Sequence, residues 1–128
     1  PRYAQYLVDM HAELKNYQEA GITQLKQVDL LKWSDDIVEA RGDFPRETER
    51  ERKERLYQNA NSFFTTGQDW ERAVATCEDL AEYYRHDAYD YDKLASVLRQ
   101  EAELFRKIVM SPRFFVSYYR VMFFGEFE

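Results

Sequence analysis

Apolar residues recur at steps of three and four along most of this chain, a spacing that places side chains on one face of a helix. The pattern predicts five helical segments, at about residues 2–15, 18–33, 48–66, 69–86 and 90–110. The second segment is less regular than the others, because its apolar residues do not share one narrow stripe. This irregularity indicates either contacts on two sides of the helix or a misplaced boundary.

Residues typical of helix ends support the third segment. Thr48 is placed to cap its first turn, and Glu51 stands three residues later, as in a capping box. Gly67 suits the C-terminal end of the same helix. Residues 34–47 precede it, contain Gly42 and Pro45, and show little periodicity, so we expect a loop there.

A different pattern follows the last predicted helix. Pro112 stops the helix from continuing, and residues 113–125 are rich in aromatic and β-branched side chains, which favour a strand. A strand this apolar requires partners that the rest of the chain does not provide. We therefore expect residues 1–112 to form a helical lobe and residues 113–128 to begin a neighbouring lobe.

Three of the predicted helix starts share an aromatic residue followed three positions later by a small or apolar one. The pairs are Tyr17 with Ala20, Trp70 with Ala73, and Tyr91 with Leu94. This arrangement is typical of the second helix in tetratricopeptide-like hairpins, although the intervals between the copies are unequal. The expected fold class is all-α: an antiparallel array of about five helices, followed by a short C-terminal β-strand.

The fifth segment carries apolar residues over about half of its circumference, more than contact with one neighbour requires. One stripe contains Tyr91, Leu98, Ala102, Phe105 and Val109, and a second contains Val97, Leu104 and Ile108. Two interpretations remain open at this point. Either both stripes are internal, or segments four and five form a self-association surface, for which the candidate residues are Tyr83, Tyr84, Val97, Leu104 and Ile108.

Composition narrows the classes of function. The net charge is −6, with 24 acidic and 18 basic residues, which argues against binding to nucleic acid through phosphates. There is one cysteine, Cys77, so an internal disulfide is impossible and a reducing compartment is expected. The sequence contains no apolar run long enough to cross a membrane.

Candidate chemistry is sparse. His11 and His86 have no second histidine or cysteine at metal-ligand spacing, and Cys77 lies on the apolar face of its helix. No glycine-rich phosphate loop and no nucleophile with a general base is visible. We therefore expect no metal, no cofactor and no enzymatic activity from this chain alone.

Several short motifs, taken in order, resemble the start of the Dock-homology region 2. That region is the exchange domain of DOCK-family guanine nucleotide exchange factors. The motifs occupy residues 11–20, 30–35, 56–57, 63–73, 80–84, 90–94 and 118–125. Residues 31–34 resemble Rac-directed members and residues 119–125 resemble other branches, so the motifs leave the subfamily open.

The resemblance implies a function for the helical lobe. It implies lobe A of the exchange domain, which supports a β-rich lobe, is associated with homodimerisation, and carries no exchange residues itself. The implied partner is a Rho-family GTPase, Rac-like, bound through other lobes in the cytoplasm. Residues 113–128 would enter the β-rich lobe, with candidate lobe contacts at Phe114, Tyr118, Val121 and Phe123.

A competing interpretation comes from the periodicity alone. Tetratricopeptide-like hairpins also build scaffold or peptide-binding modules that have no link to GTPases. Such a module would present a groove lined by exposed polar residues, whereas an exchange factor would continue into a β-rich lobe.

Overall fold

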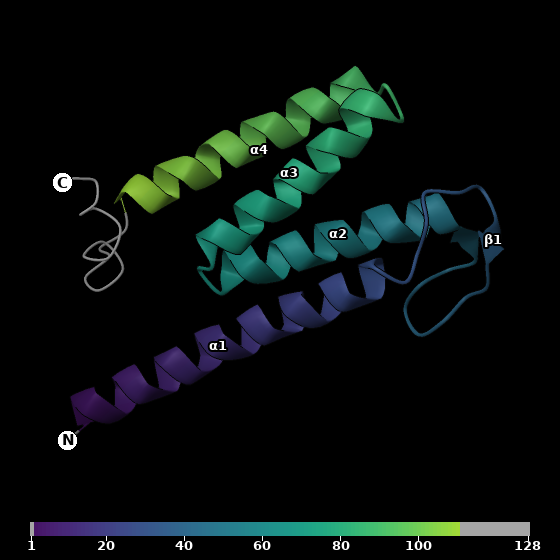
Figure 1. Cartoon of the computed structure of the whole chain (residues 1–128). Coiled ribbons are helices and arrows are strands. Elements are labelled where there is room, and N and C mark those ends of the chain that lie inside the picture. Colours follow the sequence, from purple (N-terminus) through teal and green to yellow (C-terminus); the bar gives the residue numbers. More distant parts are fainter. Residues whose placement is uncertain (1, 111–128) are drawn as a thin grey trace.

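Four helices form an antiparallel array in the computed structural model, which describes residues 2–110. They are α1 (Arg2–Val28), α2 (Glu49–Thr66), α3 (Trp70–His86) and α4 (Tyr91–Met110). Close backbone contacts link only consecutive helices, so α2 and α3 lie inside the array and α1 and α4 lie at its two sides (Figure 1). The all-α class is confirmed within the described residues. The predicted strand after Pro112 lies outside them.

The prediction of five helices differs from the structure at α1, which is one continuous helix where two segments were expected. Residues 15–18 contain no proline or glycine to interrupt it, and the misplaced boundary explains the irregular stripe of the second segment. Gly21 lies inside the helix against the ring of Phe64. A Cβ atom at Gly21 would stand 2.6 Å from Phe64 Cε1, so glycine here permits the close approach of α1 to α2.

Residues 29–48 connect α1 to α2 and contain little regular structure. The predicted loop at residues 34–47 lies within them, but the prediction of helix up to residue 33 is wrong, because α1 ends at Val28. Within them, β1 (Ile37–Val38) pairs with β2 (Glu47–Thr48) in an antiparallel two-stranded sheet. Arg41 and Phe44 exchange backbone hydrogen bonds of 2.9 Å across a tight turn. Gly42 has a φ of 57° in this turn, a conformation that glycine adopts without steric cost.

Helix α2 begins and ends where the sequence predicts. Thr48 and Glu51 form the capping box, with the Thr48 hydroxyl accepting from Glu51 N at 3.1 Å and Glu51 Oε1 accepting from Thr48 N at 3.0 Å. Gly67 is the C-cap and donates its N–H to Phe63 O at 2.8 Å. It also lies close to α1, because a Cβ atom there would stand 3.0 Å from Leu14 O.

The connection is fixed to the helices by aromatic stacking. The Trp33 ring stacks on Tyr83 of α3 with ring centroids 3.6 Å apart, and on Tyr57 of α2 with centroids 5.9 Å apart. Lys53 of α2 also contacts Trp33. Its Nζ lies 5.0 Å from the Trp33 ring centroid and donates to Leu31 O at 2.9 Å. Residues 31–33 are therefore joined to both inner helices.

Charged side chains of α2 complete the attachment. Glu49 accepts hydrogen bonds from Ser34 Oγ at 2.6 Å and Lys32 N at 2.8 Å, and these bonds hold the pKa of Glu49 below its usual value. Arg50 donates to Trp33 O at 3.0 Å and forms an ion pair with Asp35 at 3.1 Å. Three backbone groups of the connection, Leu31 O, Lys32 N and Trp33 O, thus have hydrogen-bond partners on α2.

An apolar core and a buried hydrogen-bond network around Asn61 stabilise the array. The core residues are Val28, Leu56, Tyr57, Ala60, Phe64, Ala73, Val74, Cys77, Leu80, Ala81, Tyr83, Tyr84, Leu94, Val97 and Leu104. Asn61 on α2 donates to Ala73 O at 3.0 Å and to Cys77 Sγ at 3.3 Å, and accepts from Gln100 on α4 at 2.6 Å. Because its polar groups are satisfied only in this arrangement, Asn61 fixes the register of three helices.

Candidate interaction surface

The two apolar stripes of α4 have different surroundings. Leu94, Val97 and Leu104 face α3 and are at most 9% exposed, and Ile108 packs against the same core. The stripe that begins at Tyr91 faces away from the array. It consists of Tyr91 (63% exposed), Leu98 (38%), Phe105 (47%) and Val109 (82%), and we call these four residues the outer stripe.

The outer stripe lies on a side helix of the array, with no further helix against it in the described part of the chain (Figure 1). Large apolar side chains are rarely exposed in a continuous row on a monomeric protein unless another surface covers them. The outer stripe is therefore the candidate interaction surface on α4.

The residues that sequence reasoning assigned to a dimer surface are located elsewhere. Tyr83, Tyr84, Val97 and Leu104 are at most 5% exposed, and Ile108 is partly buried against the core. These side chains contact α2 and α3 of the same chain, so they are unable to contact a second copy in this arrangement. The helices named in the prediction stay the same, but the stripe of α4 that is open to a partner is the other one.

Tyr83 and Tyr84 illustrate why the sequence was misleading here. Both are tyrosines near the end of a helix, where an exposed position is common. Their hydroxyl groups nevertheless form hydrogen bonds to other side chains of the chain. The Tyr83 hydroxyl accepts from Arg50, and the Tyr84 hydroxyl donates to Glu54, whose carboxylate Lys93 of α4 also binds at 3.1 Å. Burial and the Glu54 carboxylate together raise the pKa of Tyr84 far above its ordinary value. Tyr84 therefore stays neutral, and the hydroxyls of both tyrosines have structural roles.

Charges of both signs flank the outer stripe. Asp92 lies in the first turn of α4 and Lys107 in its last turn, with Lys93, Arg99, Glu101, Glu103 and Arg106 between them. Two such helices placed antiparallel would bring Asp92 of each copy toward the basic residues near the end of the other.

Chemistry other than association is poorly supported within residues 2–110. No group of three or more histidine, cysteine or acidic side chains is arranged there to hold a metal ion. Burial raises the pKa of the Cys77 thiol to about 11, which leaves it unreactive. His86 lies 3.6 Å from Glu82 on the same helix, and His11 is exposed.

Comparison with known proteins identifies the family. The family model for DHR-2, Lobe A matches residues 51–110, which include most of α2 and all of α3 and α4. Over 97% of its length the chain is 35% identical to "Dedicator of cytokinesis protein 3" from Mus musculus, and over 98% it is 35% identical to "Dedicator of cytokinesis protein 4" from Homo sapiens. The chain belongs to the DOCK family.

The DOCK relatives extend the match beyond the three helices of the family model. A match over nearly the whole chain includes α1 and the connection of residues 29–48. "DOCK-like protein 1" of Saccharomyces cerevisiae is 30% identical over 87% of the chain. The chain spans about 6% of the length of these curated relatives. Among the described residues, no helix combines the length and the apolarity that crossing a membrane requires.

Proposed function

We propose that this DHR-2 lobe A is a non-catalytic part of a guanine nucleotide exchange factor for Rho-family GTPases, most similar to those acting on Rac. Its role is to support the catalytic lobes and to provide a homodimer surface. Membership of the DOCK family supports the exchange-factor assignment. The GTPase would be bound by other lobes, and a cytoplasmic location suits a chain whose single cysteine is buried and reduced.

The observation that carries the dimer proposal is the exposure of the outer stripe. Four large apolar side chains of α4 face outward in a row, and burying each one would contribute roughly 1.5 to 3 kcal/mol relative to full exposure. A symmetric partner is the simplest cover, because an antiparallel copy of α4 presents the same apolar row and can place Asp92 near the basic residues at the end of its partner. Asp92 of each copy would then face Arg106 of the other.

Sedimentation equilibrium of the whole chain tests this surface. We expect a concentration-dependent dimer for the native sequence, and a monomer for the double variant Leu98→Arg with Phe105→Arg. Leu30→Arg is the matched control, because Leu30 is 81% exposed on a different part of the molecule. It should leave the dimer intact, and all three proteins should melt at similar temperatures. A native chain that stays monomeric to about 100 μM, or a double variant that still dimerises, would refute the proposal.

The non-catalytic role has a separate test. Release of a fluorescent GDP analogue from a Rac-type GTPase should be unaffected by this chain, because the exchange residues are proposed to lie in other lobes. Acceleration by the isolated chain would contradict the proposal. In the complete exchange factor, Leu104→Asp should reduce exchange by unfolding the lobe, since Leu104 is 4% exposed.

A tetratricopeptide-like scaffold unrelated to GTPases is the second function that the sequence suggested. It has less support, because the likeness to DOCK proteins covers nearly the whole chain. The antiparallel helix pairs are compatible with either function, and the likeness to tetratricopeptide hairpins stays a prediction. So do the division at residue 112 and the lobe contacts at Phe114, Tyr118, Val121 and Phe123, which lie outside the described residues.

A further inference from the structure

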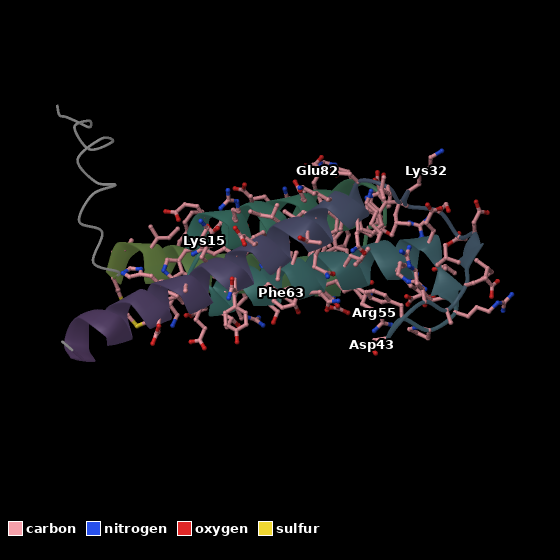
Figure 2. All side chains as sticks on the ribbon, turned by 90° about the horizontal axis from the view of Figure 1, so that it is seen from below. Lys15, Lys32, Asp43, Arg55, Phe63 and Glu82 are labelled. Carbon is pink, nitrogen blue, oxygen red and sulfur yellow. The ribbon has the colours of Figure 1, made fainter. Side chains whose placement is uncertain are left out.

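A cleft of about 800 Å³ lies between the C-terminal part of α1, one side of α2 and the turn at residues 41–44. Its lining combines apolar and polar side chains, among them Gln24, Leu31, Phe44, Arg55, Asn59 and Phe63. In Figure 2, Phe63, Arg55 and Asp43 follow one another along one edge of the molecule, and Lys32 and Glu82 lie on the opposite edge. The cleft lies on α1 and α2, whereas the outer stripe lies on α4 at the other side of the array (Figure 1).

The outer wall of the cleft is held in place by specific contacts. The Arg52 guanidinium lies 4.9 Å from the centroid of the Phe44 ring and donates to Pro45 O at 2.8 Å. Arg52 also forms a buried ion pair with Glu47 at 2.6 Å. These contacts fix the turn at a distance from α2 and keep the cleft between them open.

Cations predominate around this cleft although the whole chain is acidic. Arg41, Arg52 and Arg55 line it together with a single acidic residue, Asp43. Glu47 lies behind it and is already shared, since it binds Arg52 and accepts from Arg55 Nη2 at 3.1 Å. Arg55 is half-exposed and keeps N–H groups free of Glu47, and the Arg41 side chain has no hydrogen-bond or ion-pair partner among residues 2–110.

Gln24 contributes an unsatisfied acceptor. Its Oε1 atom is buried and accepts no hydrogen bond in the described part of the chain. A buried acceptor without a donor is unfavourable, so turning the Gln24 amide toward an N–H group in the cleft would be favourable. The cleft therefore offers donors for an anion and, once the Gln24 amide turns, an acceptor for an N–H group.

We propose that this cleft binds an extended acidic segment of a partner protein. A carboxylate of the segment would bind Arg41 and Arg55, a backbone N–H would donate to Gln24 Oε1, and an apolar side chain would pack on Leu31 and Phe63. A free phosphate satisfies the arginines but has no apolar group to pack on Leu31 and Phe63. Nucleic acid is disfavoured by the net charge of −6. An acidic peptide matches all three kinds of group.

The first test is fluorescence anisotropy with a labelled octapeptide that alternates glutamate and leucine, added to the whole chain. Two matched peptides carry glutamine or lysine in place of glutamate. We expect binding of the glutamate peptide, at least tenfold weaker binding of the glutamine peptide, and none of the lysine peptide. Equal binding of all three, or no binding of the glutamate peptide at 1 mM, about the limit of weak specific binding, overturns the proposal.

Substitutions locate the binding site. Arg41→Gln and Arg55→Gln should each weaken the glutamate peptide about tenfold, which corresponds to about 1.4 kcal/mol. Neither should unfold the chain, because Arg41 is exposed and the Glu47–Arg52 pair remains when Arg55 is replaced. Arg99→Gln on α4 is the matched control and should bind like the native chain. If the control loses as much affinity as the two cleft variants, the attraction is non-specific and the proposal is wrong.

The side-chain amide signals of Gln24 report specific binding, because a purely electrostatic attraction would not change them. In a proton–nitrogen NMR spectrum, the side-chain amide signals of Gln24 should shift as the glutamate peptide is titrated. Gln24→Leu should weaken binding severalfold while leaving the salt dependence unchanged, since it removes an acceptor and no charge. Inorganic phosphate at matched ionic strength should produce no shift at Gln24. A shift with phosphate alone, or none with the peptide, would contradict the proposal.

Discussion

The connection of residues 29–48 and the outer stripe of α4 differ in how far other parts of the chain cover them, and the difference is the opposite of what their polarity suggests. The connection is polar and irregular, yet Trp33 is stacked between α2 and α3, and Glu49, Arg50 and Lys53 bind its backbone. The outer stripe is apolar and perfectly helical, yet its side chains are exposed. Whether a segment is covered thus depends on the groups that pack against it, and its polarity alone does not determine this.

The two regions also differ in what covers them. The aromatic anchor of the connection is one half-buried tryptophan stacked on two tyrosines, and backbone groups at residues 31–33 are hydrogen-bonded to side chains of α2. The outer stripe has apolar area to bury and no helix in the described residues to bury it against. One region is completed by the lobe itself, and the other is available to a partner.

The largest effect is expected where the connection is anchored. Trp33→Ala should lower the free energy of unfolding by about 3 kcal/mol, at the lower end for tryptophan truncation because the ring is half-buried. It removes stacking on both Tyr57 and Tyr83. Urea unfolding followed by circular dichroism measures the change. A loss under about 1 kcal/mol, the typical effect of an average substitution, would mean that the connection is held mainly by its hydrogen bonds.

A smaller loss is expected at the buried ion pair. Glu47→Gln should cost about 2 kcal/mol, because it leaves Arg52 buried without its carboxylate while Arg55 can turn to solvent. Burial favours the neutral acid, but hydrogen bonds from Arg52 and Arg55 outweigh it and hold the pKa of Glu47 below its usual value. The difference in free energy of unfolding between the native chain and the variant should therefore have its full size at neutral pH.

The pH dependence of that difference follows from the sign of the shift. A carboxylate with a lowered pKa stabilises the fold above its unfolded value, and the contribution is lost as pH falls through the folded value. The Glu47→Gln variant should consequently approach the native chain in stability on acidification. Unfolding curves at several pH values below neutral measure this, and a difference that stays constant with pH would contradict the assignment.

Glu101 should respond in the opposite direction and more weakly. Burial and the neighbouring Glu78 carboxylate raise its pKa, so the ionised form is disfavoured in the folded chain at neutral pH. Glu101→Gln should increase stability there by at most about 0.5 kcal/mol, typical of a surface substitution. The gain should disappear as pH falls through the folded pKa and the native residue becomes protonated. A destabilised variant at neutral pH would be the contrary result.

The smallest effect on folding is expected on the outer stripe. Leu98→Ser should change the free energy of unfolding of the monomer by at most about 0.5 kcal/mol, because the side chain is already 38% exposed. Measurements at low protein concentration separate folding from association. A loss comparable to that of Trp33→Ala would show that the outer stripe is covered within the chain.

Prediction from sequence succeeded where local signals were strong. The capping box at Thr48 and Glu51, the end of α2 at Gly67, and the extents of α3 and α4 agree with the structure. It was wrong at α1, where a weak periodic break was interpreted as a helix boundary. It found both stripes of α4 but chose the buried one for a partner, because periodicity shows that two apolar sides exist and not which side a neighbour covers.

The cleft and the anchoring of the connection had no sequence signal. Trp33 and Tyr83 are fifty positions apart, and nothing in either segment indicates that the two rings stack. Gln24 and Arg55 likewise meet the turn of residues 41–44 only after α1 and α2 pack together. Such juxtapositions depend on the angle and register of helices, which no local pattern specifies.

The sequence by itself determined the helical class, the helix ends marked by caps, and the residues able to pack, because hydrogen bonds and periodicity act over a few positions. The tertiary structure alone decided which stripe of α4 is buried, where Trp33 lies, and which arginines meet across the cleft. These outcomes depend on long-range packing, in which Gly21 admits Phe64 and Asn61 fixes three helices in register.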